Sequence, residues 1–188
     1  MDIRSQIPPS LKWESSFDII HQRLLVWGLQ SEEWPQVLQN HLSLLKPGGW
    51  IQLVEAEWIH EGYDAAKLPN LAKITKVQKW CGSQFGMDMS LVHRLESLLQ
   101  SAGFQNISTT LYSLGYGAQA RDIAWKERSA KLWVDSFRGF AAKWPEEGIP
   151  EVAETVEEYS AVLQGLHDEL LEHGCAPNLH FVIAQKPE

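Results

Sequence analysis

The stretch that decides the fold is "LLKPGGWIQLVEAEW", residues 44–58. It begins with the leucines of a helix-like pattern, continues through one proline and two glycines, and becomes an apolar run that ends among acids and a tryptophan. Pro47, Gly48 and Gly49 are the residue types of a tight turn that stops a helix. Residues 50–58 have the composition of a buried strand. The stretch therefore predicts a helix, a turn and a strand in direct succession.

The rest of the chain continues this alternation of strands and helices. The expected strands are 17–21, 50–58, 106–115 and 178–186, and the expected helices are 32–45, 70–84, 90–102, 121–143 and 151–173. Residues 1–16 are polar and broken by two prolines, so an irregular lead-in is expected there. Strands that alternate with helices favour an α/β fold with a largely parallel sheet of about four strands.

Composition excludes several classes of protein. The chain has 188 residues, 44% of them hydrophobic, which suits one domain over residues 1–188. Its net charge is −8 and its basic residues form no run, so neither nucleic acid nor an anionic membrane is an expected partner. The seven histidines form no HxxxH or HExxH motif, so no metal site is expected. Cys81 and Cys175 are far apart in the sequence, and they suggest reduced thiols in a cytoplasmic protein.

Polar side chains follow the expected strands at the edge where open α/β sheets bind ligands. The candidates are His21, Arg23, Glu55, Glu57, Trp58, His60 and the segment from Tyr112 to Tyr116. His21 could transfer protons near neutral pH, and Arg23 could hold a carbonyl or an oxyanion. Equally, Arg23 could form a purely structural ion pair with Glu55 or Glu57. Glu57, as a third catalytic group, and His60 are weaker candidates, because polar residues at a strand end are usually just solvated.

Aromatic residues recur at nearly helical spacing in the expected helix 121–143. They are Trp125, Trp133, Phe137, Phe140 and Trp144. Such a stripe is more often core packing. It could also form an apolar wall over a substrate, in which case Trp133 and Phe137 would be binding residues.

Two longer motifs carry a resemblance to a known family. "FDIIHQRLLVWGL" (17–29), a helix and then "LLKPGGWIQLVE" (44–55) resemble the fourth and fifth strands of class I S-adenosylmethionine-dependent methyltransferases, in particular those of fungal secondary metabolism. The resemblance implies a truncated Rossmann-like fold with helices on both faces. It also implies that 70–84 and 121–173 are substrate-covering insertions, or a lid. In "MDI", Asp2 resembles the acid that contacts adenine in this family.

The same resemblance identifies what the chain lacks. The family's first strand leads into a GxGxG turn that holds the cofactor, and an acid after the second strand holds the ribose. Gly48-Gly49 and Gly115-Tyr116-Gly117 do not stand between a strand and a helix in that way. The chain alone is therefore expected to use no cofactor.

Three functions follow as alternatives. The first is a repurposed cofactor-independent cyclase or isomerase of secondary metabolism, similar to the methyltransferase-like pericyclases, which acts on an apolar polycyclic or polyketide-type intermediate. The second is an S-adenosylmethionine-dependent methyltransferase whose cofactor-binding half is missing or supplied by a partner. The third is a non-catalytic binding or assembly protein.

The resemblance also predicts assembly. In the complete family fold, the strand that matches Phe17–His21 pairs with a neighbour on each side. Without one neighbour, this apolar strand would leave a row of backbone groups unpaired, and neither lysine nor proline protects it. A homodimer through this edge is expected, with a partner that carries the other half as the alternative.

Overall fold

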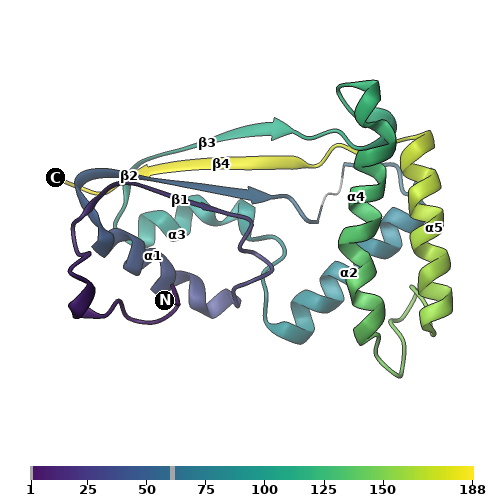
Figure 1. The fold of residues 1–188 in the computed structure, drawn as a ribbon, viewed down its shortest axis with the longest axis horizontal. Coiled ribbons are helices and arrows are strands. Elements are labelled where there is room, and N and C mark those ends of the chain that lie inside the picture. Colours follow the sequence, from purple (N-terminus) through teal and green to yellow (C-terminus); the bar gives the residue numbers. More distant parts are fainter. Residues whose placement is uncertain (1, 60–61) are drawn as a thin grey trace. The chain divides into compact units, whose positions relative to one another are not determined.

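The computed structural model describes residues 2–59 and 62–188, and the chain forms two compact units. The sheet unit comprises 1–57, 82–112 and 179–188, and the helical unit comprises 58–81 and 113–178. Figure 1 shows the strands of the first unit and the long helices of the second. The segments expected to be substrate-covering insertions, 70–84 and 121–173, fall largely in the helical unit.

A four-stranded sheet forms the first unit. Its strands are β1 (Phe17–Arg23), β2 (Leu45–Ala56), β3 (Gln105–Ser113) and β4 (Asn178–Gln185), arranged in the order β1-β2-β4-β3. The predicted α/β fold with four strands is confirmed. The sheet is mixed: β1, β2 and β3 run in one direction, and β4, which lies between β2 and β3, runs antiparallel to both (Figure 1).

The proline-glycine turn lies inside β2 rather than before it. Phe17 pairs with Leu45, and the next paired residue of β1, Ile19, is opposite Trp50, so residues 46–49 bulge out of the register. Gly48 has a φ of +72°, which glycine adopts without strain. A Cβ on Gly49 would lie 2.9 Å from the Lys46 carbonyl oxygen. The two glycines therefore allow the strand to begin directly after the preceding helix.

Two helices cover one face of this sheet. They are α1 (Trp34–Leu44) and α3 (Leu95–Ser101), which lie on the same side of the strands in Figure 1. Buried leucine, isoleucine and valine side chains fill the space between them. They include Val37, Leu38, Ile51, Leu53, Leu95 and Leu99. Each such side chain contributes about 1.5–3 kcal/mol when it leaves water, so this layer is the core of the sheet unit.

The opposite side of the sheet carries no helix of the sheet unit, and we call it the open face. The strand register places alternate residues together there, because Ile19 is opposite Trp50 and Gln52 is opposite Ile183. The open face comprises Ile19, His21, Arg23, Trp50, Gln52, Tyr112, Phe181 and Ile183. Four of its apolar or aromatic members are exposed, from 36% for Trp50 and Ile183 to 69% for Ile19, and Phe181 is half-buried.

Three longer helices build the helical unit. They are α2 (Pro69–Phe85, whose last residues, 82–85, belong to the sheet unit), α4 (Lys126–Arg138) and α5 (Val156–Glu172). The Glu169 carboxylate accepts the backbone N–H groups of Asn70 (2.8 Å) and Leu71 (3.1 Å), so α5 caps the positive end of α2. The Tyr159 hydroxyl donates to the Phe137 carbonyl oxygen at 3.0 Å, which ties α5 to α4.

Two general features complete the fold. Across 2–59 and 62–188, every helix is too short or too polar to cross a lipid bilayer. Cys81 and Cys175 are free and buried, and burial raises the pKa of the Cys175 thiol to about 12. Both cysteines are thus thiols packed in the interior.

Candidate functional site

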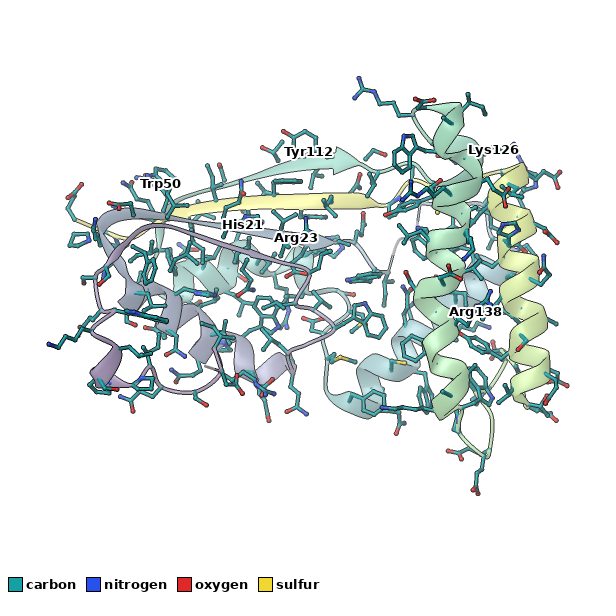
Figure 2. The ribbon with its side chains drawn as sticks, viewed as in Figure 1. His21, Arg23, Trp50, Tyr112, Lys126 and Arg138 are labelled. Atoms are coloured by element: carbon teal, nitrogen blue, oxygen red, sulfur yellow. The ribbon has the colours of Figure 1, made fainter. Side chains whose placement is uncertain are left out.

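His21 and Arg23 lie on the open face, two residues apart on β1, and both side chains are exposed (Figure 2). The His21 Nδ1 atom lies 2.9 Å from the Gln52 Oε1 atom. Because an amide oxygen only accepts hydrogen bonds, Nδ1 is the donor in this contact, and in the neutral ring the lone pair is on Nε2. The pair therefore offers one proton acceptor and one permanent cation to a molecule on this face.

The alternative in which Arg23 forms a structural ion pair finds no support. Within the described part of the chain, no ion pair joins Arg23 to Glu55 or to Glu57. The Glu55 carboxylate is fully buried and instead accepts the backbone N–H groups of Leu25 (2.8 Å) and Val26 (3.4 Å). Arg23 is consequently available to a ligand, whereas Glu55 holds the turn after β1.

Glu55 is a titrating group in the core rather than a substrate contact. Burial raises the pKa of its carboxyl to about 7, and the two backbone hydrogen bonds only partly offset this. The group therefore ionises near neutral pH without reaching solvent. Glu55 lies near the end of β2, where the rule for open α/β sheets expects ligand contacts, but its side chain points to the helix side of the sheet.

Glu57 belongs to a cluster that the sequence did not indicate. Its carboxylate lies 3.9 Å from the His93 Nε2 atom, and the His93 ring meets the His180 ring edge to face at 5.7 Å. His180 is 7% exposed, and burial lowers its pKa. The three groups come from separate segments of the chain, so only the folded sheet unit brings them together. No three histidine, cysteine, aspartate or glutamate side chains of the described residues could hold a metal ion.

The remaining predicted binding residues divide between the two units. Tyr112 lies on the open face, 56% exposed, with its ring 4.9 Å from that of Phe181 (Figure 2). Trp58 lies in the helical unit beside a cavity of about 10 Å³, which is room for one water molecule at most. His60 lies outside the described residues.

Trp133 and Phe137 lie in the core of the helical unit. They are 9% and 1% exposed, with their ring centroids 5.5 Å apart, and Trp133 also meets Tyr116 edge to face. This placement favours core packing over the substrate wall. Trp125, the first residue of the predicted aromatic stripe, does not join this core. It is 52% exposed and faces a groove on the other side of α4.

That groove, which we call the α4 groove, was not predicted from the sequence. It has a volume of about 1090 Å³ and is formed by residues 114–116, 120–125 and the outer side of α4. Its walls include the exposed apolar side chains Leu114, Ile123, Trp125 and Leu132. The sequence predicts a helix from residue 121, whereas residues 117–119 and 123–125 form short 3-10 turns and α4 begins only at Lys126.

Two arginines of the α4 groove have no carboxylate partner among the described residues. The Arg128 guanidinium lies over the Trp125 ring at 4.9 Å, and Arg121 makes no ion pair there. The acids nearby have other partners: Asp122 accepts the Ala124 N–H at 2.9 Å, and Asp135 contacts Lys131, which lowers its pKa. The groove therefore combines apolar walls with two available cations.

The glycines that could suggest a cofactor loop make close contacts within the protein. A Cβ on Gly115 would lie 1.9 Å from the Gln119 carbonyl oxygen, and one on Gly117 would lie 1.9 Å from that of Leu170. The space beside each glycine is thus filled by the chain's own backbone rather than left for a ligand. Asp2, the possible adenine contact, forms an ion pair with Arg4 at 2.7 Å that lowers its pKa to about 2. These residues do not fit S-adenosylmethionine.

Comparison with known proteins identifies the family. No family model matches the chain. It is 30% identical over 162 residues to the N-methyltransferase tcpN of Claviceps purpurea, covering 85% of this chain and 56% of that protein. It is 24% identical over 175 residues to the methyltransferase pytC of Aspergillus terreus, which covers 91% of this chain and 53% of that protein. The chain belongs to the class I methyltransferase family.

The structural comparison agrees with this assignment at the level of fold. A candidate methyltransferase from Bacillus halodurans superimposes with a TM-score of 0.52 and 11% identity, covering all of this chain and 76% of that protein. The chain nevertheless spans only about half the length of the curated methyltransferases it matches. This methyltransferase-family chain thus shares the fold of that solved structure, and the space beside its Gly115 and Gly117 is filled by its own backbone.

Proposed function

We propose that this chain is a small-molecule enzyme of the methyltransferase family that acts on an apolar, ring-containing acid without binding S-adenosylmethionine by itself. The α4 groove is the observation that carries the proposal. Its volume of about 1090 Å³ is at the upper end for ligand sites, which are roughly 300–1,000 Å³, and such sites combine apolar walls with a few polar groups. The secondary-metabolism relatives agree with a small-molecule substrate.

Charge and shape give the class of ligand. A fused or multi-ring body suits the walls formed by Trp125 and Leu132, which are 52% and 58% exposed. Arg121 and Arg128 favour a carboxylate, an enolate or a similar anionic group, because a guanidinium donates two parallel hydrogen bonds to such oxygens. A cation would instead meet two like charges. The substrate proposed from the groove is therefore an apolar anion.

The proposed chemistry is a cyclisation or an isomerisation. Such a reaction rearranges bonds within one molecule, so it needs no co-substrate. For a reaction on the open face of the sheet unit, His21, with Nε2 as the proton acceptor, would move a proton, and Arg23 would stabilise negative charge that develops on a carbonyl oxygen; the α4 groove is proposed as a binding site by itself. Glu57 lies beside His93 and His180 on the helix side of the sheet, away from His21 and Arg23, so no part in this reaction is proposed for it.

A second function is favoured by the names of the relatives. TcpN and pytC are named methyltransferases and are about twice as long as the matched region. Under this alternative, a glycine-rich segment from another source completes the cofactor site, and this chain supplies substrate recognition. Both proposals require the α4 groove to bind the substrate, but they differ in whether the reaction needs S-adenosylmethionine, held with the help of another segment, or proceeds without it.

The groove can be tested with 8-anilino-1-naphthalenesulfonate, an apolar aromatic anion that fluoresces when bound. We expect the double variant Arg121→Gln/Arg128→Gln to bind it at least about tenfold more weakly, since a charge-assisted hydrogen bond is lost at each arginine. The uncharged analogue N-phenyl-1-naphthylamine should bind both proteins alike. Fluorescence titration measures both affinities.

Arg138→Gln is the matched control, because Arg138 lies at the opposite end of α4 from Lys126 and does not line the groove (Figure 2). It removes the same charge from the same helix and should leave the affinity for the sulfonate unchanged. Equal weakening by Arg138→Gln would mean that net charge alone attracts the probe. Loss of binding in Ile183→Lys would place the probe on the open face. Either result would refute the proposal that the probe binds in the α4 groove.

A further inference from the structure

Gln78 is a buried polar side chain in the core of the helical unit. It lies on α2 and is 1% exposed. Its Nε2 atom has no hydrogen-bond partner among residues 2–59 and 62–188. A buried amide without a partner is costly, because folding has removed the hydrogen bonds that it makes to water in the unfolded chain. A group from outside the chain is therefore needed to satisfy it.

A small cavity lies against the Gln78 side chain. Its volume is about 10 Å³, and all the residues that line it belong to the helical unit. Its apolar walls include the buried side chains of Leu71, Trp133 and Pro177. A bound water molecule needs roughly 10–15 Å³ of such space. The cavity thus has room for one water molecule and for no larger ligand.

Two hydroxyl groups supply further polar atoms to this cavity. The Thr75 hydroxyl donates to the Leu71 carbonyl oxygen at 3.1 Å, and the Tyr63 and Thr75 hydroxyl oxygens lie 3.1 Å apart. Because Thr75 has used its proton, the Tyr63 hydroxyl is the donor to Thr75. A hydroxyl oxygen has two lone pairs, so Thr75 can accept a second hydrogen bond. The cavity therefore brings an acceptor close to the Gln78 donor.

From this arrangement we infer that the cavity binds one ordered water molecule, which accepts a hydrogen bond from the Gln78 amide and donates one to the Thr75 hydroxyl oxygen. Water fits both the volume and the polar groups, because it donates and accepts at once. It also satisfies the amide in either orientation, with the nitrogen or the oxygen toward the cavity. The Cys175 sulfur, a weak donor and acceptor, belongs to the same lining and offers a further contact.

The water lies where three parts of the helical unit meet. Gln78 and Thr75 belong to α2, Trp133 to α4 and Cys175 to the segment before β4. Gln78 is then a water ligand rather than a defect of the core. The cavity and the α4 groove share no lining residue, so the inference stands apart from the proposed substrate.

Gln78→Met tests the site, because methionine has a similar length and shape but no amide. A crystal structure of the wild-type chain should show a water within about 3.2 Å of both the Gln78 amide and the Thr75 Oγ1 atom. Gln78→Met should lack this water. Gln164→Met is the matched control, because Gln164 is exposed on α5, where its Nε2 atom donates to Asp168 at 3.2 Å. This variant should keep the water.

Water oxygen-17 relaxation dispersion tests the same site in solution, since it responds to water molecules that stay inside a protein for many nanoseconds. The wild type and Gln164→Met should each hold one long-lived water more than Gln78→Met. A wild-type structure in which the Gln78 amide bonds a protein group instead would overturn the proposal, as would a water that persists in Gln78→Met. If Gln78→Met does not fold, the wild-type structure alone decides.

Discussion

Replacing Glu55 by glutamine is expected to destabilise the sheet unit at pH 5 and to stabilise it at pH 8, in each case relative to the wild type. Burial raises the pKa of this carboxyl from 4.5 to about 7, so the folded state holds the proton more tightly than the unfolded state does. The stabilisation from Glu55 is complete below pH 4.5 and is lost as the pH rises through 7. By linkage, the loss amounts to about 3 kcal/mol.

Glutamine cannot ionise, so Glu55→Gln should be less stable than the wild type at pH 5 and more stable at pH 8. Hydrogen exchange of the β2 amides measures this difference within the sheet unit. Glu32→Gln removes an exposed carboxylate from the same unit and should follow the wild-type curve. If the curves of Glu55→Gln and the wild type stay parallel across this range, the buried carboxyl does not titrate as described.

Replacing Phe137 by alanine is expected to destabilise the helical unit by roughly 3–5 kcal/mol, the usual loss for a buried phenylalanine. The side chain is 1% exposed and packs against Trp133, while its carbonyl oxygen accepts the Tyr159 hydroxyl. Hydrogen exchange of the α4 and α5 amides measures the loss. Binding of the naphthalene probe, scaled to the folded fraction, should not change.

Leu132→Ala is the matched comparison on the same helix. Leu132 is 58% exposed and lines the α4 groove. Its truncation should change stability by less than about 0.5 kcal/mol and should weaken probe binding instead. If Phe137→Ala kept full stability and lost the probe, Phe137 would be a substrate wall and the core assignment would be wrong.

The sequence predicted the layout of the fold well because periodicity encodes it. The strands at 17–21 and 50–58 and the helix between them were all found, and Gly103 and Gly174 end their helices with φ values of +98° and +67°. The direction of β4 was not predictable in the same way. A buried strand has the same composition whether it pairs parallel or antiparallel, and only the path of the chain decides.

The candidate site was harder to predict because it depends on where side chains point. Glu55 and His21 both follow the rule for strand ends, yet Glu55 turns to the core and His21 to the open face. The α4 groove left a weaker signal still, since Leu114, Trp125 and Leu132 belong to different local structures. Trp125 and Trp133 have the same residue type and helix-like spacing, and packing alone separates the exposed one from the buried one.

The central claim is that a methyltransferase-family chain works without holding the family's cofactor itself. Calorimetric titration of the purified chain with S-adenosylmethionine and S-adenosylhomocysteine tests this most directly. We expect no saturable heat at ligand concentrations up to about 1 mM, because the chain's own backbone fills the space beside Gly115 and Gly117. Binding with a micromolar dissociation constant, about −8 kcal/mol, would contradict the account and favour methyl transfer.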